Sequence, residues 1–203
     1  MVERVYAGMS AEERSRRRRE QFLAAGLEVF AERGWAASTV ADVCRTAALS
    51  PRYFYELFGS REELFRAVTA RIADDVRATV RAAVATPSDD PQVRARAVLA
   101  ALAQYFTADP RTVRVALMES LATAEFRRDR REFLESFGAL AARLMRSLRT
   151  EPAADGALET SAWVLTGGLV ELLITRSAEP VAAGSLDRLL DQLTALYTAA
   201  ARL

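Results

Sequence analysis

The spacing of apolar residues predicts a chain built of helices. Near the N-terminus, apolar positions recur at i, i+3, i+4, i+7 and i+8, which is one face of a helix. These positions are Phe22, Ala25, Gly26, Val29 and Phe30. Gly34 follows them and suits a left-handed cap, so the first helix is expected at about 11–33.

Two short helices joined by a tight turn are expected next. Thr39 and Asp42 fit the two positions of a capping box, which predicts a helix at about 39–46. Ser50 and Pro51 fit the N-cap and the first position of the helix that follows. The inward-facing residues have the spacing that two steeply crossing helices need. They are Val40, Val43, Cys44, Leu49, Phe54 and Leu57.

The rest of the chain is predicted to be helical as well. The expected segments are about 61–86, 91–107, 111–123, 124–149, 156–178 and 185–202. The first of them follows the capping box of Ser60 and Glu63 with no linker before it. One continuous helix is therefore expected to join an N-terminal helix-turn-helix domain, residues 1–60, to a C-terminal helical domain, residues 61–203.

Composition agrees with an all-α fold and narrows the chemistry. Ala, Leu, Arg and Glu dominate the 203 residues, while Gly and Pro are scarce. With no histidine and one cysteine, ordinary zinc sites and histidine-dependent nucleophiles are excluded, so no catalytic residue, metal or cofactor is predicted. We find no signal peptide and no long apolar run, so we expect a cytoplasmic protein without a membrane partner.

The outward-facing residues of the third helix are candidates for DNA contact. The net charge of the chain is only +1, so affinity for nucleic acid must come from a local patch. Arginine can bond guanine O6 and N7 together, a tyrosine ring can pack on a thymine methyl, and helix N-termini suit phosphates. The predicted contacts are Thr39, Ser50, Pro51, Arg52, Tyr53, Tyr55 and Arg61. Taken singly, the tyrosines also suit ordinary packing.

A run of arginines precedes the first apolar position. Arg14 and Arg16 to Arg19 would spread over all faces of a helix, so most of them would be solvated. One interpretation is a frayed, soluble terminus. The other is an arm that contacts phosphates or a minor groove, with Arg17 and Arg18 as the candidate residues.

The stretch from Phe22 to Leu64 resembles the N-terminal domain of TetR-family transcriptional regulators. The landmarks are AERGW at the end of the first helix, Thr39 to Asp42, Ser50-Pro51, Phe54-Tyr55, Phe58 and SREEL. The resemblance implies a ligand-responsive regulator, a repressor, that a small molecule releases from double-stranded DNA. Two departures, Ala48 in place of the usual glycine and the bulky Tyr53, prevent an operator sequence from being carried over from relatives.

The resemblance also implies a homodimer whose last two helices pair into a four-helix bundle. Such a dimer would present two recognition helices to a palindromic operator. The apolar stripes of the last two helices look wider than one core-facing surface needs, although packing on their own subunit explains part of them. The predicted interface residues are Leu165, Gly168, Leu169, Leu172, Leu189, Leu193, Leu196 and Tyr197.

The middle helices are expected to enclose a cavity for a small-molecule effector. The candidate lining residues are Tyr105, Phe106, Met118, Glu119, Phe137, Trp163, Thr166 and Glu171. Each apolar member is also what a plain core would contain. Glu119 and Glu171 lie in apolar stretches and need a partner if buried, either an arginine such as Arg114 or a bound ligand.

Two other functions fit the same sequence. One is a helical enzyme or lipid-binding protein whose N-terminal helices do not bind DNA. The other is a DNA-binding adaptor controlled by a protein partner, which a body without a cavity of about 300 Å³ would favour.

Overall fold

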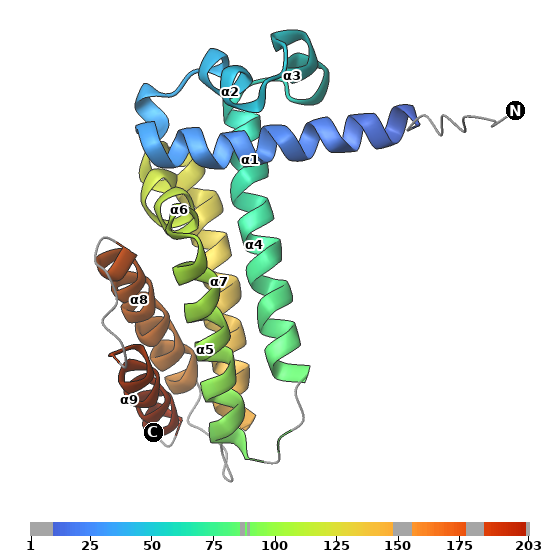
Figure 1. Ribbon diagram of the computed structural model, residues 1–203. Helices are drawn as coiled ribbons and strands as arrows, with labels where there is room; N and C mark the ends of the chain where they lie inside the picture. Colours follow the sequence, from blue (N-terminus) through green and yellow to red (C-terminus); the bar gives the residue numbers. More distant parts are fainter. Residues whose placement is uncertain (1–9, 86–87, 89, 148–155, 178–184, 202–203) are drawn as a thin grey trace, which may run out of the picture. The chain divides into compact units, whose positions relative to one another are not determined.

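The computed structural model describes residues 10–85, 88, 90–147, 156–177 and 185–201, and these residues form helices and no strand (Figure 1). The all-α prediction is confirmed. The chain divides into two compact units, Met1–Ala70 and Arg71–Leu203, which we call the head unit and the body unit. The division falls inside the helix that begins at Arg61, later than the boundary expected after residue 60. The reason is that Leu64, Phe65 and Val68 are buried with the head unit.

The helices of the head unit surround a core that is rich in aromatic rings. The Phe22 ring meets the rings of Phe54 and Phe58 edge-on, at centroid distances of 5.5 and 6.2 Å. Rings at these separations add stability beyond the area that they bury. The helices are α1 (Ala11–Ala37), α2 (Val40–Ala47), α3 (Pro51–Leu57) and the start of α4 (Arg61–Ala85).

Two positive φ angles shape the head unit. Gly34 has φ 75° and ψ 163°, so it bends α1 near the expected cap, and the helix resumes to Ala37 instead of ending at 33. Ala48 follows α2 with φ 52° and ψ 38°, the left-handed region that favours glycine. The turn between α2 and α3 therefore holds an alanine in the conformation that glycine adopts most readily.

The body unit packs helices in pairs around an apolar core. Helix α7 packs on α8 and α5 packs on α9, while α8 and α9 also lie side by side (Figure 1). Residues from all four helices meet in the core, with Leu99, Met145, Leu158 and Tyr197 among them. The helices after α4 are α5 (Pro91–Ala108), α6 (Pro110–Val113), α7 (Ala124–Ser147), α8 (Ala157–Ser177) and α9 (Ser185–Ala200).

The single helix expected at 111–123 is wrong. After α6 the chain widens into a π-helix, η1 (Arg114–Met118), and then tightens into a 3₁₀ turn, η2 (Glu119–Leu121). Two side chains form hydrogen bonds to the backbone of this segment. The Ser120 hydroxyl donates to the Ala116 carbonyl, and Arg130 Nε donates to the Leu117 carbonyl. These bonds satisfy carbonyls that the irregular helix leaves available.

Helix α8 is more apolar than the sequence analysis recognised. Its 21 residues include an 18-residue stretch with a mean hydropathy of 1.4, long and apolar enough to cross a membrane by length and composition alone. One such helix is weak support for a membrane span, because core helices pass the same test. Only 17% of that stretch is buried inside the chain, so much of the apolar surface of α8 has no partner within the described residues.

Candidate nucleic-acid interface

Helix α3 is held by one deeply buried residue. Phe54 has no exposed surface, and its ring packs against Phe22 and Phe58 in the head unit. Pro51 occupies the first turn, as predicted, where its missing N–H costs nothing. Ser50 is the N-cap residue, but its side chain makes no capping hydrogen bond, so its hydroxyl is exposed rather than used as expected. The anchored Phe54 leaves the other face of α3 turned outward.

The outward face of α3 carries the residues predicted to touch DNA. The side chain of Arg52 is 84% exposed, and Tyr53 and Tyr55 are 37% and 61% exposed. Arg52 Nε donates to Glu56 Oε1 over 3.0 Å. Exposed pairs of this kind contribute only about 0.3–0.5 kcal/mol, so a guanine or a phosphate can replace Glu56 as the partner of Arg52. Glu56, one turn along the same exposed face, is therefore the partner of Arg52 in the absence of DNA.

Thr39 is the N-cap residue of α2 and forms the predicted capping box with Asp42. Its hydroxyl accepts from the Asp42 backbone N–H and donates to Asp42 Oδ2, at 3.1 and 2.7 Å. This hydrogen bond, with the guanidinium groups of Arg45 and Arg33, holds the pKa of Asp42 below its usual value against the opposing effect of burial. Thr39 itself is exposed, so its backbone lies at the surface as a phosphate contact requires.

Arg61 is occupied by the head unit itself. Its Nη1 donates to the backbone carbonyls of Trp35, at 3.1 Å, and of Ser38, and its guanidinium lies 3.9 Å from the centre of the Trp35 ring. These contacts tie the start of α4 to the end of α1. Arg61 therefore stabilises the head unit. The predicted contact of its charge with a DNA phosphate stays a prediction.

The arginine run belongs to α1 rather than to a frayed end. Helix α1 starts at Ala11, where Ser10 and Glu13 form a capping box. Arg17 is exposed, while the guanidinium of Arg18 lies over the Tyr53 ring with Cζ 4.5 Å from its centroid. Helix α1 thereby brings arginines to the edge of the α3 surface, within the head unit.

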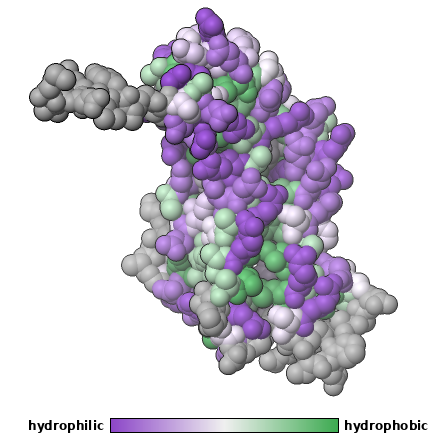
Figure 2. All heavy atoms as spheres, turned by 90° about the vertical axis from the view of Figure 1, so that its right-hand side faces the viewer, coloured by the Kyte–Doolittle hydropathy of each residue, from purple (hydrophilic) through white to green (hydrophobic). Residues whose placement is uncertain are grey.

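Three of the predicted cavity residues line an apolar cavity of about 80 Å³ in the body unit: Phe106, Phe137 and Thr166. Its walls come from α4, α5, η1, α7, α8 and α9, and apart from Thr166 and Tyr197 they are apolar. On the face shown in Figure 2, apolar side chains gather in one area of the body and hydrophilic ones predominate elsewhere. A second hollow, a groove of about 350 Å³ between α5, α6, α8 and α9, adjoins this cavity through Leu99 and Phe106.

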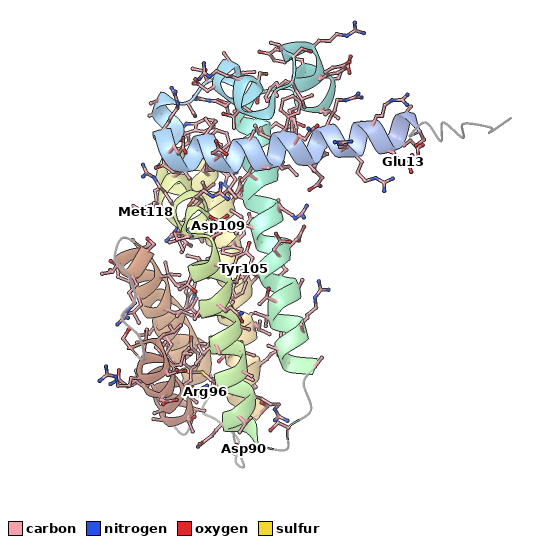
Figure 3. The ribbon with its side chains drawn as sticks, in the orientation of Figure 1. Glu13, Asp90, Arg96, Tyr105, Asp109 and Met118 are labelled. Carbon is pink, nitrogen blue, oxygen red and sulfur yellow. The ribbon has the colours of Figure 1, made fainter. Side chains whose placement is uncertain are left out.

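The other cavity candidates lie elsewhere. Met118 is 43% exposed and Trp163 is 41% exposed, and neither lines the cavity (Figure 3 labels Met118). Glu171 is exposed, so the expectation of a buried carboxylate is wrong there. Glu119 is partly buried and pairs with Arg114 at 3.6 Å, the structural partner that the sequence analysis offered. Tyr105, half-buried on α5, does not line the cavity, and burial raises the pKa of its hydroxyl to about 12.

Most of the predicted interface residues face their own subunit. Leu165, Leu169, Leu172 and Leu189 pack against the body core, and Leu193 and Tyr197 are buried in it. Gly168 and Leu196 alone among the predicted residues are exposed.

The exposed apolar face of α8 lies on another side of the helix from its predicted leucines, and no partner chain tests which side forms an interface. It comprises Trp163, Val164, Gly167 and Gly168, spaced as neighbours on one face, a signal that the sequence itself contained.

The fold and this surface define a helix-turn-helix protein with an arginine- and tyrosine-bearing helix turned outward. Residues 22–68 match the family described as bacterial regulatory proteins, tetR family. This match, together with the relatives and the solved structure described below, supports a regulator of the TetR family of transcriptional regulators. This is a family of regulators rather than of enzymes.

Curated relatives and a solved structure agree with that assignment. The chain is 33% identical over 106 residues to the transcriptional activator FasR of Mycolicibacterium smegmatis, covering 52% of this chain and 48% of that protein. It is 36% identical over 76 residues to the regulator BetI of Rhizobium meliloti, and this match covers 36% of this chain and 37% of BetI. The matches thus span half or less of these relatives. A TetR-like regulator from Rhodococcus sp. RHA1 shares the fold, with a TM-score of 0.75, 20% identity and coverage of 94% and 96%.

Proposed function

We propose that this chain is a cytoplasmic regulator that binds operator DNA through the outward face of α3. One observation carries the proposal: Phe54 is fully buried while Arg52, Tyr53 and Tyr55, its neighbours in sequence, are exposed. A helix anchored on one side and free on the other can enter a major groove without disturbing the core. Arg52 then reads guanine, and Tyr55 reaches a phosphate.

The test is a selection of genomic DNA fragments by the purified protein, followed by binding measurements on the recovered duplex. The double variant Arg52→Ala, Tyr55→Ala should lose sequence-specific binding while its thermal unfolding stays the same. Arg143→Ala, an exposed arginine of α7 in the body unit, is the matched control for charge and should bind normally. Specific binding by the double variant would show that α3 does not read the DNA.

We propose further that the protein is a homodimer held by the exposed faces of α8 and α9. The support is a patch of apolar or small residues without a partner in the described part of the chain: Trp163, Val164, Gly167, Gly168 and Leu196. A Cβ atom added at Gly167 or Gly168 would meet nothing within 4 Å, so a second helix could approach the backbone closely there. Val164 is 69% exposed and lies on the same exposed face of α8 as these glycines, so apolar surface and open backbone occur together there.

Sedimentation of a charge-insertion variant tests the dimer. Val164→Arg should give monomers, because it places a charge in the centre of the proposed interface. Gln104→Arg adds the same side chain at an exposed position of α5 and should leave the dimer intact. A Val164→Arg protein that sediments as a dimer would place the interface elsewhere.

We also propose that a largely apolar small molecule controls DNA binding from the body unit. The groove of about 350 Å³ has the size of a ligand site, whereas the cavity of about 80 Å³ alone is too small for most ligands. An effector must bind one state of the protein better than the other to change its affinity for DNA. Repression relieved by the effector is the expected outcome in a reporter assay, although FasR is named an activator.

A screen of apolar compounds by thermal stabilisation, followed by DNA-release measurements, tests this control. A compound that stabilises the protein and weakens operator binding supports it. If no compound does so while DNA binding is intact, control by a protein partner becomes the better hypothesis.

A further inference from the structure

The side chain of Arg18 joins the two helices that form the proposed DNA-binding surface. It projects from α1, and its guanidinium carbon lies 4.5 Å from the centroid of the Tyr53 ring on α3. A cation within about 6 Å of a ring face is attracted by the ring's electron density. Because both residues belong to the head unit, this contact is internal to one compact unit.

In the described part of the chain, the Arg18 side chain lacks polar partners of the kind that fix Arg52 and Arg61 near this surface. Within the described residues, the Arg18 Nε–H is buried and has no hydrogen-bond acceptor. Arg52 differs, since it pairs with Glu56, and Arg61 differs, since it bonds two backbone carbonyls. Stacking on Tyr53 is therefore the contact that the described structure offers to hold the Arg18 guanidinium in place.

The contact also restricts Tyr53. The Tyr53 ring is 37% exposed, and on an exposed helix face a tyrosine ring can rotate among side-chain conformers. A guanidinium over one face of the ring favours the conformer that keeps the stack. The opposite face and edge of the ring then point in a defined direction, and the positive charge lies beside it.

We propose that Arg18 is a positioning residue for Tyr53, and that the stacked pair sets sequence specificity at the edge of the DNA contact. This inference rests on the proposed function of the α3 surface. It separates two tasks within the arginine run. Exposed Arg17 supplies charge, which favours every duplex equally, whereas Arg18 acts through Tyr53 and favours the operator over other sequences.

The test compares Arg18→Ala with Arg17→Ala, a matched change at the neighbouring position, using the ratio of affinities for operator and random duplex. Arg17→Ala should weaken both affinities alike and leave the ratio within about twofold, because phosphate contacts carry no sequence information. Arg18→Ala should lower the ratio by about three- to thirtyfold, the range of a cation–π contact expressed as affinity. Arg18→Lys, which keeps a charge over the ring, should restore part of the ratio.

Tyr53 variants identify the route of the effect. In a Tyr53→Phe background the ring remains, so Arg18→Ala should still lower the ratio. In a Tyr53→Ala background the ring is gone, so Arg18→Ala should leave the ratio nearly unchanged. Thermal unfolding of each variant controls for damage to the head unit.

These measurements distinguish failure of the positioning role from failure of the proposed function. Equal ratios for Arg17→Ala and Arg18→Ala, or an Arg18→Ala effect of the same size with and without the Tyr53 ring, would overturn the positioning role while leaving the proposed function intact. A wild-type protein that binds no duplex would overturn the proposed function, and this inference with it.

Discussion

Replacing Ala48 with glycine should stabilise the protein, against the usual effect of such a change. Ala48 has φ 52° and ψ 38°, and the left-handed region costs an L-residue about 1–2 kcal/mol. Glycine adopts this conformation freely, but its more flexible unfolded chain reduces the gain by about 0.4–1 kcal/mol. The free energy of unfolding of the Ala48→Gly variant should therefore rise by about 0.5–1 kcal/mol.

A second alanine provides the matched control. Ala24 is exposed like Ala48, but it lies inside α1, where glycine costs about 1 kcal/mol. The same atoms are removed in both variants, so only the backbone conformation differs. Ala24→Gly should lower the free energy of unfolding as Ala48→Gly raises it.

Urea unfolding followed by far-UV circular dichroism measures both variants. A shift of the unfolding midpoint without a change of slope would show that stability alone has changed. The reasoning would be refuted if Ala48→Gly destabilised the protein as much as Ala24→Gly does. In that case the turn between α2 and α3 stores no backbone strain.

Three further changes test the interior of the head unit. Gly26→Ala should lower the free energy of unfolding by about 1–3 kcal/mol, since its new Cβ would lie 3.1 Å from Val68 Cγ2; calorimetry measures this. Arg61→Ala should lower the free energy of unfolding by about 1–3 kcal/mol, because the contacts of Arg61 with Trp35 are lost. If the stability did not change, Arg61 would have no structural role and its predicted contact with DNA would be the better explanation. The pKa of Asp42 is lower in the folded state than in the unfolded state, where it is near 3.8. The ionised carboxylate therefore adds to the free energy of unfolding above that unfolded-state pKa, and this stabilisation is lost as the pH falls through the folded-state pKa. Asp42→Asn should flatten the pH dependence of urea unfolding in that acidic range.

The head unit was predictable because its signals are local. Capping at Thr39 and the proline at Pro51 mark where α2 and α3 begin, whatever packs against them. The apolar spacing then places Phe54 inward and leaves Arg52 and Tyr55 outward. What local signals did not contain were contacts between helices, such as the engagement of Arg61 with the end of α1 and of Arg18 with the α3 ring.

The body unit was predictable in its elements but not in its faces. Helix ends fell close to the expected positions because prolines mark the starts of α5 and α6. The π-helix after α6 carries no such mark, because its carbonyls accept from the Ser120 hydroxyl and from Arg130 of the next helix, α7. The cavity candidates Met118 and Glu171 failed because the faces on which they lie are decided by tertiary packing.

The apolar pattern of α8 does not predict which side of the helix packs against the body core. Leu165, Leu169 and Leu172 on one side and Trp163 and Val164 on the other are all apolar, so periodicity alone does not tell the core side from the exposed side. The distinguishing feature is the pair of adjacent glycines. The leucines pack against the body core, whereas the two adjacent glycines lie on the exposed side. There a glycine inside a helix costs about 1 kcal/mol, and an added Cβ would meet no atom of the described residues within 4 Å. A pair of unfavourable residues facing outward makes physical sense if a second backbone approaches them closely, and the proposed dimer therefore rests on these glycines rather than on the leucines.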